Sequence, residues 1–239
     1  MISHRWLILT FLLIANSTFA NLNRIVLEPR HLTLISSEVT STVQSVDKKM
    51  GQTFSTGELI LSLDNQLFEA NYKKAIANQA RAKAVLDAQK RLFKDKAASF
   101  TELKLAEAEF ASAEAELVYA KKALDACTIK GPYEGKVQEL FVEVHERVEA
   151  GQKLVEILDD RVLTAKFLIS SMFLEKFKVG QEIDLYIKEA KKIYPATITH
   201  IAAAINPASS LVEVDADIDN SSGELKAGMT GNLHIGDDQ

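Results

Sequence analysis

The apolar positions of two stretches of the chain coincide when the sequence is compared with itself at a shift of 94 residues, which sets Ile35 against Ile129. Each stretch has apolar residues at strand spacing with turn residues between them, a pattern typical of short β-strands. Gly57 of the first stretch matches Gly151 of the second. The matched apolar positions are Ile35, Val39, Val43, Val46, Phe54, Ile60 and Leu63 in the first stretch, and Ile129, Tyr133, Val137, Leu140, Val148, Leu154 and Ile157 in the second.

Turn positions of the two stretches match as well. Gly51 stands opposite His145, and histidine is among the residues that better tolerate a positive φ, so we expect a turn at both places. Ser41 stands opposite Gly135. A repeat of this size is too small to bury a core alone. We therefore expect residues 32–64 and 128–160 to interlock face to face as one β-sandwich.

The segment between the repeats, residues 65–127, predicts an antiparallel pair of helices of about 27 residues each. It is rich in Ala, Lys, Glu, Gln and Leu, which are strong helix formers, and it lacks Gly and Pro. Ser99 followed by Glu102 is a capping-box signature, which puts the break between the helices at residues 95–99. Apolar residues alternate three and four apart in the second helix at Leu103, Ala106, Phe110, Ala113, Leu117, Ala120, Leu124 and Cys127.

This spacing is the seam of a coiled coil, and Leu103, Phe110, Leu117 and Leu124 are its large members. A weaker seam runs along the first helix through Phe68, Tyr72, Ala75, Gln79, Ala82, Leu86, Gln89 and Phe93. We expect the outer faces to be polar and solvated. Such a hairpin is a spacer or a docking arm and offers no pocket.

The last third of the chain predicts a small antiparallel β-barrel, formed by residues 21–31 and 161–239. Short, evenly spaced strands are typical of such barrels. Ser170 and Ser171 are positioned to cap a short helix that directs Phe173, Leu174 and Phe177 inward, and Asp159-Asp160 indicates a charged turn. The expected strands are 25–28, 162–169, 182–187, 194–201, 211–218 and 229–235. The predicted fold class is mixed α and β, elongated and multidomain.

Residues 1–20 predict a secretory signal peptide. Arg5 supplies a positive start, the largely apolar stretch 6–15 follows, and Thr18 and Ala20 place small residues before a cut after Ala20. An uncleaved membrane anchor is the alternative, but a spanning helix needs about 20 apolar residues. We therefore expect an exported, soluble protein.

Composition and charge exclude several classes of function. The 239 residues are 47% hydrophobic and 26% charged, which is a globular composition. A net charge of -5 provides no basic footprint for nucleic acid. One cysteine, Cys127, allows neither a disulfide framework nor a cysteine zinc site, and we expect it to be a small buried apolar residue.

Candidate catalytic and metal-binding patterns are weak. The five histidines are scattered, and His145 is interpreted as a turn residue. The series Asp215, Asp217 and Asp219 suggests a calcium loop, but Asn220 and Lys226 occupy positions where such a loop needs glycine and glutamate. Alternating acids on the water-facing side of a strand explain the series. We expect no enzymatic activity, no metal and no cofactor.

The order of signal peptide, strand repeat, helical hairpin, strand repeat and barrel resembles the periplasmic adaptor proteins, or membrane fusion proteins of the HlyD type, of Gram-negative tripartite efflux systems. The segment Thr128–Val137 is similar to the family's apolar-x-Ala-Pro-x-x-Gly-x-Val pattern, and Leu225–Ile235 is similar to its Leu-x-Pro-Gly-Met stretch. The repeats resemble the halves of a lipoyl domain. In lipoyl and biotinyl carriers a modified lysine lies between the halves, whereas here Asp64 leads into the hairpin and Lys48 and Lys49 lie elsewhere.

The resemblance implies that the hairpin tip docks on an outer-membrane channel. The family's tip pattern is Arg-x3-Leu-x6-Ser; Leu92 and Ser99 fit it, and Ala88 occupies the arginine position. The basic residues Lys90, Arg91 and Lys96 lie nearby. The alternative is that Leu92 is hairpin core and Ser99 is a helix cap.

The partners implied by the resemblance are an inner-membrane transporter of the RND type, the outer-membrane channel and further copies of the chain in a ring. The protein would be held at the inner membrane through the transporter and would export small molecules. The alternatives are an adaptor of an ATP-driven exporter (type I secretion or macrolide type), a lipoyl or biotinyl carrier domain of an enzyme complex, and a free periplasmic binding module.

Overall fold

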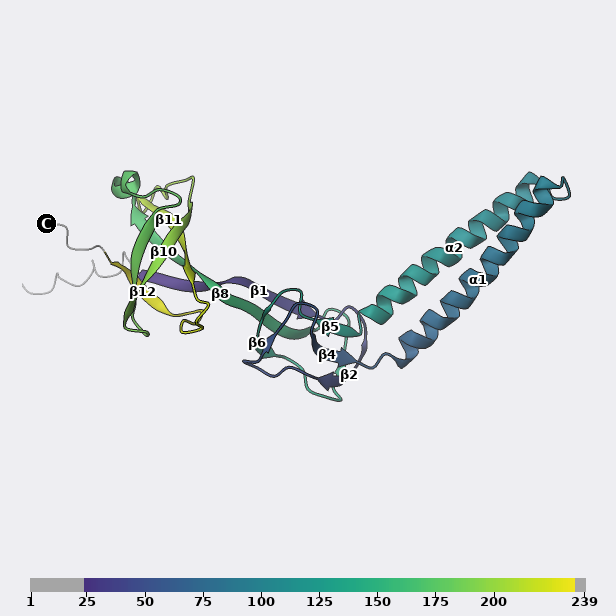
Figure 1. Ribbon diagram of the computed structural model, residues 1–239, viewed down its shortest axis with the longest axis horizontal. Coiled ribbons are helices and arrows are strands. Elements are labelled where there is room, and N and C mark those ends of the chain that lie inside the picture. Colours follow the sequence, from purple (N-terminus) through teal and green to yellow (C-terminus); the bar gives the residue numbers. More distant parts are fainter. Residues whose placement is uncertain (1–23, 235–239) are drawn as a thin grey trace, which may run out of the picture. The chain divides into compact units, whose positions relative to one another are not determined.

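A computed structural model describes residues 24–234 of the chain. The predicted signal peptide, residues 1–20, lies outside the described residues, as do residues 21–23 and 235–239 of the predicted barrel. The chain forms two compact units, one of residues 31–159 and one of residues 24–30 with 160–234. The fold is mixed α and β, as the sequence predicts (Figure 1).

The two sequence repeats exchange strands in the unit of residues 31–159. Strand β2 (Ser41–Val46) of the first repeat pairs with β7 (Arg147–Val148) of the second, with Ser41 opposite Val148. Strand β3 (Thr53–Phe54) pairs with β6 (Gly135–Leu140), with Phe54 opposite Gly135. A shift of 94 residues converts one pairing into the other. The predicted interlocking of the repeats is therefore confirmed by the strand register.

Backbone hydrogen bonds repeat the same exchange at the turns. The Gly51 N–H donates to the Val137 carbonyl at 2.8 Å, and the matching His145 N–H donates to the Val43 carbonyl at 2.8 Å. Gly51 has φ 82° and His145 has φ 72°. The prediction that His145 is a turn residue equivalent to Gly51 is confirmed, because both occupy the left-handed region.

The core of this unit lies between two layers of strands. One layer is a four-stranded sheet in the order β5-β4-β2-β7, and the other comprises β3, β6 and the first part of β8. Every matched apolar position of the repeats is buried in this core or packs against it. The remaining strands of the layers are β4 (Leu59–Leu63), β5 (Thr128–Lys130) and β8 (Lys153–Ser170).

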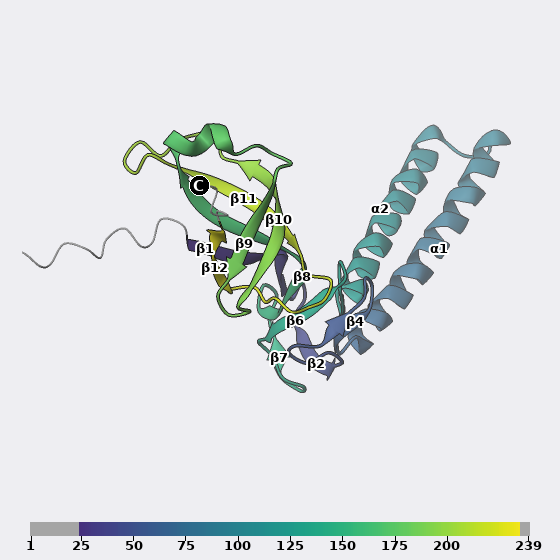
Figure 2. The ribbon, with the colours of Figure 1, turned by 60° about the vertical axis from the view of Figure 1, so that its left-hand side comes forward.

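Two antiparallel helices are inserted between β4 and β5. Helix α1 (Gln66–Lys94) has 29 residues and α2 (Phe100–Asp125) has 26, so they are about 44 Å and 39 Å long. They lie side by side in both views (Figures 1 and 2). At their root the Leu63 N–H donates to the Cys127 carbonyl at 2.8 Å, and β4 pairs with β5. Sheet pairing thus fixes where the first helix leaves and the second returns.

Cys127 is buried at this root, as predicted. Its thiol donates to the Ala123 carbonyl at 3.4 Å. Burial raises the pKa of the thiol to about 11, with a smaller contribution from Asp64. The thiol is therefore protonated at neutral pH and contributes as a small apolar group.

The second unit is a closed six-stranded barrel in the order β1-β12-β9-β10-β11-β8, with β1 also paired to β8. The predicted strands are confirmed, and β9 has the predicted bounds. On β11 the even-numbered residues 212–218 are buried, while Glu213, Asp215 and Asp217 lie on the other face. The strands are β1 (Arg24–Ser36), β9 (Glu182–Ile187), β10 (Lys192–Ile201), β11 (Leu211–Asp219) and β12 (Thr230–His234).

Two sequence interpretations, one on β8 and one on the short helix that follows it, are wrong. Asp159 and Asp160 do not form a turn; both are buried within β8, because this strand continues from one core into the other without a break. Phe173 does not point inward but is 52% exposed. The short helix η1 (Ser171–Lys176) is a 3₁₀ helix, whose three-residue turn directs Leu174 and Phe177 to the barrel core instead.

Gly135→Ala should destabilise the unit of residues 31–159 by disturbing the pairing of β6 with β8. A Cβ at Gly135 would overlap the backbone carbonyl of Leu158, so β6 would have to move away from β8. We expect a loss of about 1–3 kcal/mol in the free energy of unfolding, measured by urea denaturation followed by circular dichroism.

The matched control is Ser41→Ala at the equivalent position of the first repeat, which already carries a Cβ. Ser41 loses one exposed hydrogen bond, from its hydroxyl to the Asp64 carbonyl at 2.7 Å, so we expect a cost of about 1 kcal/mol or less. Equal effects of the two substitutions would contradict a close approach at Gly135.

Candidate functional site

The connection between α1 and α2 is a short, well-defined turn. The Lys96 N–H donates to the Phe93 carbonyl at 3.0 Å and the Ala97 N–H donates to the Leu92 carbonyl at 2.8 Å, which is a Schellman motif. Lys96 has φ 58° at the position where glycine is usual. Its left-handed conformation therefore ends α1 and leaves an exposed lysine at the turn.

Ser99 starts α2 with the predicted capping box. Its hydroxyl accepts from the Glu102 N–H at 3.2 Å, and the Glu102 carboxylate accepts from the Ser99 N–H at 2.7 Å. Hydrogen bonding to its carboxylate by the Ser99 N–H, and to a smaller extent by the Ser99 side chain, lowers the pKa of Glu102 below its ordinary value. The role of Ser99 as a helix cap is confirmed.

Three apolar side chains lie exposed beside this turn, and we call them the tip cluster: Leu92, Phe93 and Phe100. Leu92 is 43% and Phe100 is 62% exposed. The ring centroids of Phe93 and Phe100 are 6.3 Å apart at 56°, and Lys104 Nζ lies 5.4 Å from the Phe100 centroid. Exposed apolar side chains grouped at the end of a rod are suited to docking on another surface.

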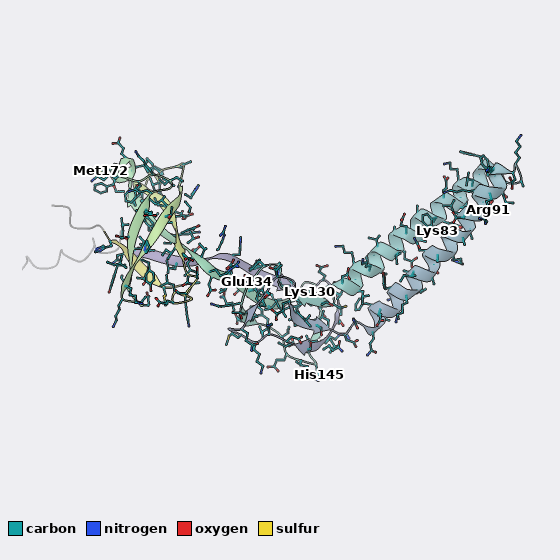
Figure 3. All side chains as sticks on the ribbon, viewed as in Figure 1. Lys83, Arg91, Lys130, Glu134, His145 and Met172 are labelled. Carbon is teal, nitrogen blue, oxygen red and sulfur yellow. The ribbon has the colours of Figure 1, made fainter. Side chains whose placement is uncertain are left out.

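Basic side chains surround the tip cluster. Lys90, Arg91, Lys94 and Lys96 are all exposed, and Figure 3 shows Arg91 at the end of the hairpin. Phe100 was missed by the sequence reasoning, which interpreted Phe93 only as a seam residue. The seven-residue spacing between these phenylalanines, across a turn, was the available signal.

The predicted seam residues occupy the less exposed face of the hairpin. Leu103, Phe110, Leu117 and Leu124 are half-buried, while Ala106 and Ala120 between them are buried. The expectation of a wholly polar outer face is wrong, because six further apolar side chains of the helices are exposed. They are Leu67, Ile76, Val85, Leu105, Val118 and Tyr119.

A hollow lies at the root of the hairpin, where the sequence reasoning expected none. It has a volume of about 540 Å³ and lies between the helices and the loops around Val39 and Ala150. Alanine supplies three of the eight helical residues that line it. The lining residues are Glu38, Val39, Thr40, Phe68, Asn71, Lys74, Ala75, Glu116, Tyr119, Ala120, Ala123 and Ala150.

Within residues 24–234, no cluster of three or more His, Cys, Asp or Glu side chains is placed to hold a metal ion. The helices in this part of the chain also lack the combination of length and apolar character that a bilayer crossing requires.

No protein-family model matches the sequence. A Haemophilus influenzae protein described as uncharacterized is 27% identical over 212 residues, which cover 87% of this chain and 55% of that protein. The chain thus spans about half the length of this curated relative.

Solved structures with similar folds include membrane fusion proteins. A candidate efflux transporter of Bacteroides eggerthii has a TM-score of 0.77 and 20% identity over 88% of this chain and 67% of that one. A MacA-MexA chimera with the Pseudomonas aeruginosa MexA α-hairpin has a TM-score of 0.75 and 23% identity over 90% and 78%. The Streptococcus pneumoniae membrane fusion protein Spr0693 has a TM-score of 0.70 and 21% identity over 90% and 98%.

The chain therefore has the fold of membrane fusion proteins. The resemblance found in the sequence is confirmed for the fold by these structures.

Ser99→Ala should loosen the turn that carries the tip cluster. We expect the amide hydrogen of Glu102, which donates to the Ser99 hydroxyl, to exchange roughly fivefold faster, because a lost N-cap costs about 1 kcal/mol. The pKa of Glu102 should rise toward its ordinary value, since one of the hydrogen bonds that lower it is lost. Both quantities are measurable by nuclear magnetic resonance.

Ser112→Ala, an exposed mid-helix change in α2, is the control and should alter neither quantity. Because the pKa of Glu102 is lowered in the folded chain, the capping box stabilises the turn at neutral pH. Its contribution should decline as the pH falls through that pKa. An unchanged Glu102 pKa in Ser99→Ala would contradict a contribution of the Ser99 side chain to that pKa.

Proposed function

We propose that this chain is a periplasmic adaptor, a membrane fusion protein that links an inner-membrane transporter to an outer-membrane channel. The observation that carries the proposal is a helical hairpin rooted in a core built from both sequence repeats, on the fold of membrane fusion proteins. The function is mechanical: the chain joins two membrane proteins and encloses the path between them.

In this proposal the chain divides into the domains expected from the sequence. Residues 32–64 and 128–160 form a lipoyl-like domain, and residues 65–127 form a coiled-coil hairpin. Residues 21–31 and 161–239 form the barrel domain. The predicted signal peptide directs the chain to the periplasm, where it is held at the inner membrane through the transporter.

The tip cluster is the proposed contact with the outer-membrane channel. Full burial of a leucine or phenylalanine side chain is worth about 1.5–3 kcal/mol, and these side chains are already about half buried, so one tip contributes only a few kcal/mol. Lys90, Arg91 and Lys96 add charge around it. Several copies packed in a ring present several tips at once, which makes a weak single contact strong.

A carrier role is disfavoured by the connection at the root of the hairpin. Carriers present a modified lysine between the halves, but here β4 ends at Leu63 and α1 begins at Gln66. The Asp64 N–H between them donates to the Thr42 carbonyl at 2.7 Å. Lys48, within the first repeat, is paired with Glu58 at 2.6 Å. A lipoyl or biotinyl adduct in the intact mass of the native protein would overturn this argument.

We propose a transporter of the RND type and small molecules as cargo, because helices of 29 and 26 residues form a short hairpin. An ATP-driven exporter remains the second candidate. Genes adjacent to this one test the choice, since an RND pump gene supports the first and an ATP-binding transporter gene supports the second.

Leu92→Asp should abolish export and leave the fold intact, because the side chain is at the tip and far along the sequence from either β core. We expect drug susceptibility to rise to the level of a strain that lacks the gene. Val118→Asp is the matched control: Val118 is 58% exposed on α2, about 27 Å along the helix from its start, and its replacement should preserve export.

A photocrosslinker in place of Lys96 should capture an outer-membrane channel in wild-type cells and lose it with Leu92→Asp. Unchanged susceptibility of the Leu92→Asp strain, or crosslinks at Lys96 that never contain a channel, would count against tip docking.

A further inference from the structure

One end of the barrel unit carries exposed apolar side chains that the proposed adaptor role does not use. Met172 is 86% and Phe173 is 52% exposed on η1, and Val179 is exposed three residues past its end. Figure 3 shows Met172 pointing away from the barrel. Leu174 and Phe177 pack against the barrel core, whereas Met172 and Phe173 are exposed.

A loop without charge lies next to η1. Residues 201–212 contain no charged side chain, and those from Ala203 to Ser210 are all exposed, including Ile205. The Ser171 N–H at the start of η1 donates to the Ser210 carbonyl at 2.9 Å, which ties the loop to the helix. We call η1 and residues 202–210 together the barrel end.

Two lysines border this apolar surface. Lys176 and Lys178 are exposed, and Lys176 Nζ lies 5.6 Å from the centroid of the Phe173 ring. Residues 171–179 contain these two lysines and one acidic residue, Glu175. This segment therefore has a net positive charge, whereas the whole chain has a net charge of -5.

We propose that the barrel end binds the surface of a lipid bilayer that contains anionic phospholipids. An aromatic and a methionine side chain, exposed beside lysines, match the chemistry of the bilayer interface, where apolar groups enter the acyl boundary and lysines reach the headgroups. The adjoining loop lacks charges, so its approach to the interface carries no cost of burying a charge. The lysines complement anionic headgroups, each worth about a fivefold gain in affinity.

The binding gives the chain a membrane contact of its own, distinct from the hairpin tip and independent of the proposed transporter. A single contact of this kind is weak and reversible, because only a few side chains enter the interface. Its effect is to raise the local concentration of the chain at the membrane.

A tryptophan reporter tests the contact at the site itself. Trp6 is the only tryptophan in the sequence and lies in the predicted signal peptide, so Phe173→Trp in the processed chain reports on η1 alone. Vesicles of phosphatidylcholine and phosphatidylglycerol in equal parts should shift its emission to shorter wavelength, and brominated lipids should quench it. Phe141→Trp in the same background is the control, because Phe141 is also exposed, has Lys153 Nζ 5.8 Å from its ring and is adjacent to no uncharged loop.

Substitutions of the lysines and of Met172 separate the electrostatic contribution to binding from the apolar contribution. Lys176→Glu with Lys178→Glu should weaken binding of the Phe173→Trp reporter to the anionic vesicles by roughly tenfold or more. Met172→Ser should weaken binding to anionic and neutral vesicles alike. Phosphatidylcholine vesicles alone should bind less than the mixed vesicles.

Three results would overturn the proposal. One is an unshifted spectrum of the Phe173→Trp reporter with anionic vesicles, and another is an equal shift of the Phe141→Trp control. The third is a shift with native inner membranes but none with protein-free vesicles, which would identify a membrane protein as the partner. Each readout is independent of export, so failure here leaves the proposed adaptor function standing.

Discussion

Two short antiparallel pairings between the sequence repeats support the rest of the unit of residues 31–159. β2 pairs with β7 and β3 pairs with β6, so each repeat completes the other's layer. Neither repeat has enough strand surface to close a core by itself. The exchange also brings β4 beside β5, and these strands hold the two roots of the hairpin together.

This arrangement explains how a long helical insertion is tolerated in a small β structure. The helices start after β4 and end before β5, and these two strands are paired. The insertion therefore does not force apart the strands that form the core. Sheet hydrogen bonds and the buried Cys127 fix the root, while the Schellman motif at Lys96 and the capping box at Ser99 fix the other end. A hairpin fixed at both ends can hold the tip cluster in a defined place, which a docking role requires.

Much of the fold could be predicted because the signals are local or periodic. The repeat register rests on matched positions such as Val43 and Val137, the cap rests on Ser99 and Glu102, and the strands of the barrel alternate clearly. The burial of Asp159 and Asp160 could not be predicted, because two adjacent acidic residues usually indicate a turn. The local sequence does not show that a single strand, β8, contributes residues to both hydrophobic cores.

The site was predicted less completely than the fold. A helical wheel assigns Phe93 to the seam, but the seam ends where the helices end, and there Phe93 pairs with Phe100 instead. The exposure of Phe173 depends on the three-residue turn of η1, and a periodicity of 3.6 residues does not reveal that turn. The geometry of helix ends and short 3₁₀ segments is therefore where pattern reasoning failed.

The most direct test of the shared core is to divide the chain at the hairpin tip, between Ala97 and Ala98, and to produce the two pieces separately and together. We predict that the pieces co-purify as a folded complex in which the amides of β6 are protected from hydrogen exchange. In the C-terminal piece alone the same amides should be unprotected. Protection of β6 in that isolated piece would contradict a core that needs both repeats.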